Sequence, residues 1–393
     1  MAFEHLSRSL ADKKSNHLYR QRLTVNGAQG VRLAVNGQSM LSFCSNDYLG
    51  LANHPDIKRA LIDSVWQVGV GSGASHLVSG HHREHELLEQ ELAEATGRDR
   101  VLLFSTGYMA NLGAITSLMG KSGLVLEDRL NHASLLDAGL FSGARFTRYL
   151  HNDLTSLKKK LQRAGKGDKL IVTDGVFSMD GDMAPMPELA ALAEEYDAWL
   201  MVDDAHGFGP VGPTGMGVTE LFDLPQSKVQ VLMGTLGKGF GTFGAFIAGS
   251  DALIEYLINT ARTCIYTTAM PPALACATRQ SLRMVRNESW RRDHLSQLIE
   301  AFRAGVSGLG LQLMASNSPI QPVVVGSSEK ALAWSGFLRT RGILVTAIRP
   351  PTVAPGTARL RITFSAEHTH NDLRQLLQAL QEGVESAGLK PPE

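Results

Sequence analysis

The stretch AWLMVDDAH, residues 198–206, is a hydrophobic run that ends in two aspartates and a histidine. Four other short apolar runs have a similar form: VLLF (101–104), GLVLED (123–128), KLIVTD (169–174) and VQVLMG (229–234). Amphipathic stretches separate several of these runs, and helices are expected from Tyr108 and from His132. Buried strands that alternate with helices indicate a parallel sheet covered on both faces, so the predicted fold class is α/β.

The chain has 393 residues, which at roughly 150 residues per domain is enough for about two or three domains. We place a large domain at residues 56–285, because that segment holds all the predicted strands of the sheet. Residues 1–55 show a helical period over 4–21 and then short strands, and residues 286–393 begin with a charged helix. We expect the N-terminal segment to join a smaller α+β domain at the C-terminus.

The composition argues against several classes of protein. The 38 lysines and arginines balance 38 aspartates and glutamates, whereas a nucleic-acid-binding protein usually has a strong basic excess. Three scattered cysteines indicate reduced thiols, and the N-terminus lacks the apolar core of a signal peptide. No apolar run approaches the roughly 18 residues of a membrane span. We therefore expect a cytoplasmic protein that binds neither nucleic acid nor membrane.

Two charged residues at strand ends predict a cofactor. Asp203 ends the run at 198–206, and Lys238 follows the run at 229–234, between Gly237 and Gly239. Taken alone, Asp203 fits a helix cap as well as a functional acid. A lysine and an aspartate at neighbouring strand ends suit pyridoxal 5'-phosphate (PLP), because the lysine forms a Schiff base and the aspartate keeps the pyridine nitrogen protonated.

Polar residues at other strand ends extend the predicted cofactor site. The turn STGYMAN at 105–111 opens a helix, and a helix N-terminus supplies donors for a phosphate. Ser178 follows the run at 169–174, in reach of the ring's phenolic oxygen, and His132 opens a helix where it would stack on the ring. Each residue also fits an ordinary cap or turn, but their agreement in order and position favours the cofactor.

Two other motifs are given structural interpretations. His81 to His85 matches the H-x-x-E-H pattern of inverted zinc peptidases, but the match is short and no further zinc ligand is evident. We expect helix capping there and no metal, and a zinc hydrolase is a remote alternative. Lys158 to Lys160 is expected to be the solvated face of a helix, which an acidic carrier protein could also use.

With these residues in view, the chain resembles the α-oxoamine synthases, which are PLP enzymes of the aspartate-aminotransferase-like fold. The shared motifs run in order along nearly the whole chain, from NDYLGL (46–51) to TAIRPPTVAPGTARLRITFS (346–365). The resemblance implies fold type I: a large domain with a mostly parallel seven-stranded sheet, and a smaller α+β domain. It also implies a homodimer with a shared active site.

Within that family, the segments DRLNHASLLDA, VFSMDGD and IRPPTV…GTARLR favour a particular activity. They are similar to those of the member that condenses L-alanine with a pimeloyl thioester in biotin biosynthesis. The acyl carrier is left open between coenzyme A and an acyl carrier protein. A sister enzyme that joins glycine or serine to an acyl-CoA is the alternative.

The resemblance also assigns roles to residues by their place in these motifs. The catalytic residues are Lys238 for the Schiff base, Asp203 for the pyridine nitrogen and His132 for stacking on the ring. Further cofactor contacts are implied at Gly107, Tyr108, Ser178, His206, Thr235, Thr267 and Thr268, of which the last two are lent to the partner subunit. Substrate contacts are implied at Arg20, Asn46, His132, Thr352 and Arg361, with Asn46 and Arg361 on the amino-acid carboxylate.

Overall fold

The structure is a computed structural model that describes residues 3–386. Its internal contacts divide the chain into two compact units. The large unit consists of Asp47–Ser178 and Asp182–Arg292, and the small unit consists of the chain up to Asn46, Met179–Gly181 and the chain from Asp293 onwards. These boundaries lie near the expected ones after residues 55 and 285. The inclusion of Met179–Gly181 in the small unit was not expected.

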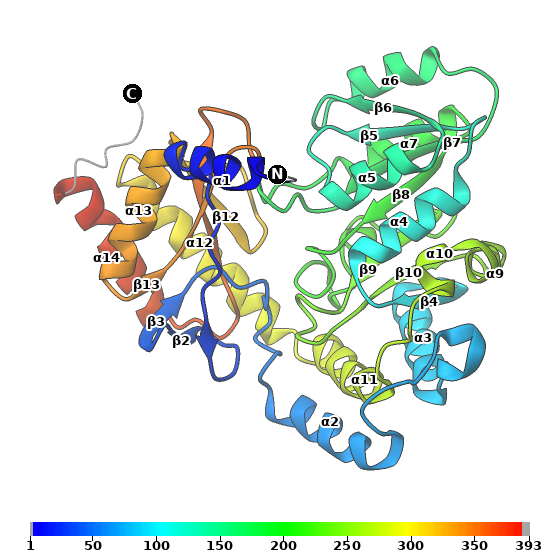
Figure 1. The fold of residues 1–393 in the computed structure, drawn as a ribbon, viewed down its shortest axis with the longest axis horizontal. Coiled ribbons are helices and arrows are strands. Elements are labelled where there is room, and N and C mark those ends of the chain that lie inside the picture. Colours follow the sequence, from blue (N-terminus) through cyan, green and yellow to red (C-terminus); the bar gives the residue numbers. More distant parts are fainter. Residues whose placement is uncertain (1–2, 387–393) are drawn as a thin grey trace. The chain divides into compact units, whose positions relative to one another are not determined.

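The large unit is built on one seven-stranded sheet (Figure 1). The strand order is β4-β10-β9-β8-β7-β5-β6, and only β10 runs antiparallel to its neighbours. The strands are β4 (Arg100–Phe104), β5 (Leu124–Asp128), β6 (Arg145–Tyr149), β7 (Lys169–Asp174), β8 (Trp199–Asp203), β9 (Val231–Thr235) and β10 (Ala245–Gly249). The expected α/β fold with a mostly parallel seven-stranded sheet is confirmed.

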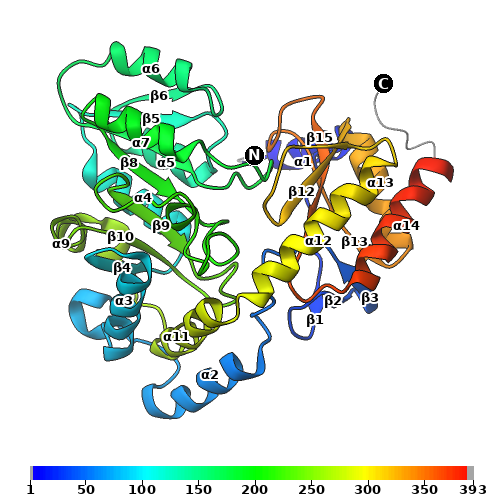
Figure 2. The same ribbon diagram turned by 180° about the vertical axis from the view of Figure 1, so that it is seen from behind.

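Helices cover both faces of this sheet because its strands are apolar on both sides. In β4, Leu102 and Phe104 face one hydrophobic cluster, whereas Val101 and Leu103 face another. Figure 1 shows α4 and α5 in front of the sheet, and Figure 2, seen from behind, shows α7 on the opposite face. The helical elements are α2 (Pro55–Val68), η1 (His76–Gly80), α3 (Arg83–Thr96), α4 (Gly107–Leu118), α5 (Ala133–Phe141), α6 (Leu154–Gln162), α7 (Met186–Glu195), α8 (Val218–Leu221), α9 (Asp251–Thr260), α10 (Arg262–Ile265) and α11 (Pro272–Asn287).

The small unit has two four-stranded sheets, and the unit boundary falls within α12 (Trp290–Ser307). One sheet has the order β1-β2-β3-β13 and the other the order β11-β12-β15-β14. The strands are β1 (Val25–Asn26), β2 (Arg32–Val35), β3 (Gln38–Ser42), β11 (Gln312–Leu313), β12 (Ile320–Gly326), β13 (Ile343–Leu344), β14 (Thr346–Ile348) and β15 (Ala358–Thr363). The helices are α1 (His5–Ser15), α13 (Ser328–Thr340) and α14 (His370–Ser386).

The helical period expected over residues 4–21 is longer than the helix that forms. α1 ends at Ser15, because His17 takes a φ of 57°, which a right-handed helix cannot contain. None of the residues of α1 is buried, so packing does not extend the helix against this break.

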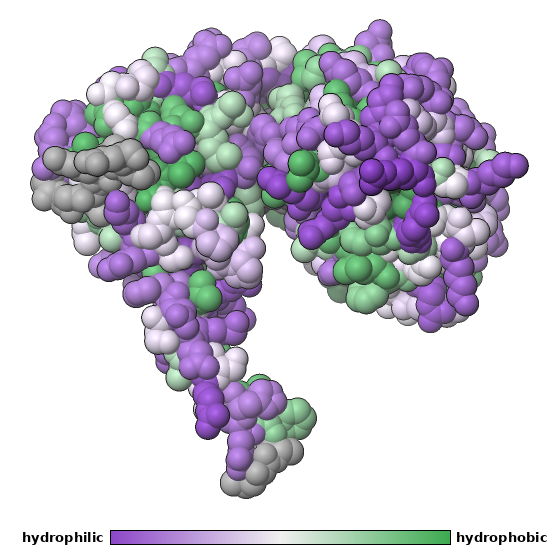
Figure 3. All heavy atoms as spheres, turned by 90° about the horizontal axis from the view of Figure 1, so that it is seen from above, coloured by the Kyte–Doolittle hydropathy of each residue, from purple (hydrophilic) through white to green (hydrophobic). Residues whose placement is uncertain are grey.

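Across residues 3–386, no helix combines the length and apolar character that a membrane crossing requires. On the face of the large unit seen in Figure 3, hydrophilic residues predominate and hydrophobic ones form smaller areas.

Candidate cofactor site

Four neighbouring strands of the large unit carry polar residues at their carboxyl ends. Asp128 ends β5, Asp174 ends β7, Asp203 ends β8 and Thr235 ends β9, and these strands are adjacent and parallel. Asp174 and Asp203 lie opposite each other in the register of β7 and β8. The carboxyl edge of an open α/β sheet is where such folds bind ligands, so the predicted strand ends do meet at one place.

Asp203 is held by two donors. Its Oδ1 accepts from the backbone N–H of Ala205 at 3.0 Å, and its Oδ2 accepts from Asn111 Nδ2 at 2.7 Å. Burial, followed by the charge of Asp203, raises the pKa of the neighbouring Asp174 carboxyl well above its usual range. The donors from Asn111 and Ala205 hold the Asp203 carboxyl in place, where a pyridinium N–H can meet it.

Lys238 belongs to a chain of three polar side chains. Its Nζ lies 2.9 Å from His206 Nε2, and His206 Nδ1 lies 2.7 Å from the hydroxyl of Tyr48. Tyr48 is fully buried and His206 is 7% exposed, so the rigid tyrosine fixes the imidazole beside the amine. The structure therefore brings Lys238 and His206 together, as the assigned roles require.

The N-terminus of α4 provides donors for an anion. Thr106 caps the helix by accepting from the N–H of Met109 at 3.2 Å, whereas the first-turn amides of Gly107 and Tyr108 have no acceptor within the helix. A Cβ on Gly107 would lie 2.9 Å from Thr235 Cγ2, so the backbone and Thr235 are in close contact. A phosphate suits this helix end.

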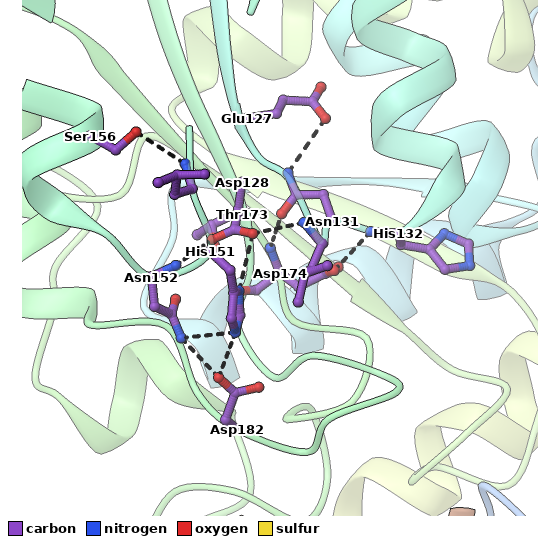
Figure 4. Close-up of polar contacts among 12 residues, drawn as sticks. Glu127, Asp128, Asn131, His132, His151, Asn152, Ser156, Thr173, Asp174 and Asp182 are labelled. Atoms are coloured by element: carbon purple, nitrogen blue, oxygen red, sulfur yellow. Dashed lines mark hydrogen bonds and ion pairs between the residues drawn. The ribbon is translucent and has the colours of Figure 1, made fainter. Parts of the chain in front are cut away.

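His132 and Ser178 stand on two loops beyond the sheet. His132 caps α5, where its Nδ1 lies 2.8 Å from Ser134 Oγ, and its backbone N–H donates to Asp174 Oδ2 at 2.8 Å (Figure 4). Ser134 Oγ also accepts from Asn111 Nδ2 at 2.8 Å, which links His132 to Asp203 through two side chains. Ser178 is half-buried in the loop after β7.

Thr267 and Thr268 lie apart from these contacts, in the loop between α10 and α11. Thr268 forms a β-bridge with Ser75, and the N–H of Ala269 donates to the carbonyl of Ala74. Thr268 is exposed and Thr267 half-buried. The role in a partner subunit that the resemblance implies for these two threonines stays a prediction.

Four of the five residues implied to contact substrate lie in the small unit, and the fifth, His132, lies in the large unit. Arg361 is 7% exposed on β15, and its Nη1 and Nη2 both donate to Asn46 Oδ1 at 3.2 Å. Arg20 and Thr352 are exposed, and the N–H of Thr352 donates to the carbonyl of Arg349. The structure thus joins Asn46 and Arg361 directly, whereas no contact of this kind links Arg20 or Thr352 to them within residues 3–386.

Two residues of the H-x-x-E-H match, Glu84 and His85, make structural contacts. His85 Nδ1 accepts from the N–H of His82, and His85 Nε2 lies 2.8 Å from the carbonyl of Met270. Burial lowers the pKa of His85 to about 4, which keeps the ring neutral in this arrangement. Glu84, the base in the zinc-peptidase interpretation, accepts from Arg279 at 2.7 Å. These contacts occupy the base and the second histidine of the zinc-peptidase pattern, although ligand atoms of His76, His81 and His85 lie within 4.8 Å of one another.

Three contacting residues were not singled out from the sequence: Tyr48, Asn111 and Ser134. Each lies in a motif that carries the family resemblance, namely NDYLGL, TGYMANLGAI and NHASLLDA. Their position within shared motifs was the available signal. Residue type alone could not separate them from turn and cap residues.

Comparison with known proteins agrees with this geometry. The profile described as aminotransferase class I and II matches residues 38–380. The chain belongs to this family. It is 61% identical over 382 residues to the 8-amino-7-oxononanoate synthase of Stutzerimonas stutzeri (strain A1501), with 97% of each chain covered. It is also 61% identical to the enzyme of that name from Pseudomonas aeruginosa (strain LESB58), covering 97% of this chain and 95% of the relative.

Solved structures of the family are similar over the whole fold. A structure of SPT with its PLP internal aldimine has a TM-score of 0.93 at 29% identity, with 98% of both chains covered. An 8-amino-7-oxononanoate synthase from Francisella tularensis has a TM-score of 0.77 at 30% identity, covering 89% of this chain and 99% of that one. The resemblance to PLP-dependent synthases is therefore confirmed.

The donor set of the large unit fits PLP. The α4 N-terminus suits the phosphate, the buried Asp203 carboxylate suits the pyridine N–H, and Lys238 offers the amine. Asp203 already accepts one bond on each oxygen, and a carboxylate oxygen has room for a further donor.

Proposed function

We propose that this protein acts as an 8-amino-7-oxononanoate synthase with PLP as its cofactor. It condenses L-alanine with a pimeloyl thioester and releases carbon dioxide and the thiol carrier, as a step of biotin biosynthesis. The observation that carries the proposal is the 61% identity to enzymes of that name over 97% of the chain. The geometry of Lys238, His206 and Asp203 supports it.

Lys238 is the group that moves the proton. When bound, PLP supplies an electron sink for the negative charge that develops at the α-carbon of alanine. The amine of Lys238 takes the α-proton, and His206, 2.9 Å away, orients the amine. Tyr48 holds the far ring nitrogen of His206, so the imidazole presents Nε2 to the lysine.

Asp203 holds the proton of the pyridine nitrogen. Its carboxylate is fixed by Asn111 and by the backbone N–H of Ala205, so it does not need to reorganise when charge develops. His132, anchored through Ser134, would lie against the face of the bound cofactor ring.

Arg361 and Asn46 hold the carboxylate of L-alanine. The planar guanidinium fork of Arg361 matches a carboxylate bidentately. In this structure the fork donates to Asn46 Oδ1, which keeps it ordered within the small unit. Arg20 and Thr352 are proposed to contact the acyl substrate.

We further propose that the acyl donor is a pimeloyl group on an acyl carrier protein. β6 is the edge strand of the large sheet, and the region of β6 and α6, here called the basic edge, is rich in cations. Its exposed members are Arg129, Arg145, Arg148, Lys159, Arg163 and Lys166. In a chain of zero net charge, this edge offers a docking surface for an acidic protein.

The carrier proposal is tested by charge reversal. The variant Lys159→Glu/Arg163→Glu should raise KM for the pimeloyl carrier protein and leave KM for pimeloyl-CoA unchanged, because the small donor does not span the basic edge. Equal effects on both donors, or no effect on either, would remove the basic edge from this role.

The cofactor role of Lys238 is tested by Lys238→Ala. The variant should lose the visible absorbance of the lysine-bound cofactor and all measurable turnover, whereas Lys228→Ala should keep both. Lys228 pairs with Glu194 on the surface and makes a matched control. Retained imine absorbance in Lys238→Ala contradicts the assignment.

We also propose a cytoplasmic location, which the free thiols of Cys44, Cys264 and Cys276 support. Localisation of a tagged chain by cell fractionation tests this, and recovery outside the cytoplasm contradicts it.

A further inference from the structure

His151, just after β6, is bonded by a carboxylate on each side and has no place in the proposed chemistry. Its Nδ1 lies 3.1 Å from Asp128 Oδ1, and its Nε2 lies 2.8 Å from Asp182 Oδ2 (Figure 4). The side chain of His151 is 18% exposed, and that of Asp128 is fully buried. An imidazole that donates from both nitrogens is an imidazolium, so the geometry calls for a positive charge here.

The environment keeps that charge at neutral pH. Burial alone would lower the pKa of His151, but the hydrogen bonds and charges of Asp128 and Asp182 outweigh it and raise the pKa to about 10. Asn152, like His151, bonds both Asp128 and Asp182. Its backbone N–H donates to Asp128 Oδ2 at 2.8 Å, and its Nδ2 donates to Asp182 Oδ2 at 2.9 Å.

The contact between His151 and Asp128 reaches the loop that carries His132. Asp128 Oδ1 also accepts from the backbone N–H of Leu130 at 2.8 Å. Asn131 Oδ1 accepts from the N–H of Asp174 at 3.1 Å, and the N–H of His132 donates to Asp174 Oδ2. Three successive residues before α5 are therefore fixed by strand-end residues, Leu130 and His132 by carboxylates and Asn131 by a backbone N–H.

The contact between His151 and Asp182 reaches the loop that carries Ser178. The carbonyl of Asp182 accepts from the N–H of Phe177 at 2.9 Å, which closes the loop. The ring of His151 packs edge-on against the ring of Phe177, with centroids 4.4 Å apart and an interplanar angle of 89°. Ser178 is the next residue in the chain.

We propose that His151 is a positioning residue, whose two carboxylate contacts clasp the loop of His132 to the loop of Ser178. The clasp sets the distance between a side chain that stacks on the cofactor ring and one that reaches the ring's oxygen. Removing the cation leaves the buried Asp128 carboxyl with two backbone donors but without its cationic partner, and such a loss is unfavourable. Both loops then loosen while the sheet stays intact.

Hydrogen exchange of the cofactor-free protein tests the clasp directly. In His151→Gln, amides of 129–132 and 176–183 should exchange about tenfold faster or more than in the wild type, with β7 and β8 unchanged. Lys228→Gln, which breaks a surface ion pair, should change neither loop. Unchanged exchange in these loops, or an equal rise throughout the large unit, would overturn the proposal.

A second measurement tests whether loosening of the two loops impairs the cofactor site. This measurement, unlike hydrogen exchange, rests on the proposed function. His151→Gln should bind PLP more weakly and lose kcat by up to about a hundredfold, while KM for L-alanine stays near that of the wild type. Asp182→Asn, which keeps the Asp128 contact, should show the same pattern more weakly and serves if His151→Gln fails to fold. A rise in KM without loss of kcat would contradict the positioning role. Wild-type inactivity with alanine would refute the proposed function and leave the exchange result standing.

Discussion

Glu127 on β5 is a buried carboxyl group with little compensation. Its side chain is fully buried, Oε2 accepts from Asn131 at 3.5 Å, and Oε1 has no partner within the described residues. Burial raises its pKa to about 8. The folded state therefore keeps a proton that the unfolded chain loses near pH 4.5. The free energy of unfolding should fall by about 1.4 kcal/mol per pH unit between pH 4.5 and pH 8.

The variant Glu127→Gln removes this titration. Its unfolding midpoint in urea, compared with that of the wild type, should rise steadily between pH 5 and pH 8. The exposed Glu300→Gln serves as the control and should show no such trend. If the unfolding midpoints of Glu127→Gln and the wild type differ by the same amount at pH 5 and at pH 8, Glu127 does not titrate as predicted.

Arg361 gives a second prediction at this scale. Arg361→Ala should raise KM for L-alanine and lose up to about 3 kcal/mol of transition-state stabilisation, because a charge-assisted pair is removed. Arg361→Lys keeps the charge but loses the planar guanidinium fork. In steady-state kinetics its KM for L-alanine should therefore lie between those of the wild type and Arg361→Ala. An alanine dependence that neither variant changes would exclude Arg361 from carboxylate binding.

Single residues could be proposed from the sequence where they ended a recognisable strand, as Asp203 does, or followed one closely, as Lys238 does. Tyr48 and Asn111 were not, because their partners lie far along the chain: Tyr48 meets His206, and Asn111 meets Asp203. Only the folded sheet brings those segments together.

Among the elements, α4 has the clearest functional consequence. Gly107→Ala would place a methyl group 2.9 Å from Thr235 Cγ2, so the helix end or Thr235 must shift. We expect weaker PLP binding in a cofactor titration, with little change in unfolding. Thr106→Ala removes the cap instead and should cost about 1 kcal/mol of stability. Equal PLP affinity in Gly107→Ala and wild type would contradict the phosphate assignment.

The elements that the sequence did not reveal are β6 and β10. β6 carries Arg145 and Arg148 and is mostly unburied, as an edge strand can be, so its pattern lacks the continuous apolar run of its neighbours. β10 follows a glycine-rich turn and runs antiparallel, which the alternation of strand and helix does not predict. The five apolar runs were predictable because burial on both faces requires them.

At the scale of the whole molecule, we propose a homodimer. Large apolar side chains stand exposed on the large unit: Trp66 at 88%, Val70 and Val78 at 79%, and Tyr266 at 71%. Tyr266 directly precedes Thr267, the residue implied to serve the partner's phosphate site. Contiguous exposed apolar patches mark interaction surfaces, and we propose that these residues belong to one.

The dimer proposal predicts that Trp66→Asp shifts the molecular mass measured by light scattering from twice the chain mass toward 42.5 kDa. It also predicts a loss of PLP affinity, because the partner's threonine segment leaves the site. A wild-type monomer would contradict the proposal.

The reaction proposed for this protein pairs L-alanine with a pimeloyl thioester, and a comparison of alternative substrates tests this pairing. Purified holoenzyme is given L-alanine, glycine or L-serine with pimeloyl, acetyl or succinyl thioesters, and thiol release and the amino-ketone product are followed. L-Alanine with the pimeloyl thioester should give the highest kcat/KM and yield 8-amino-7-oxononanoate. A higher kcat/KM for glycine or serine, with any of these thioesters, would contradict it.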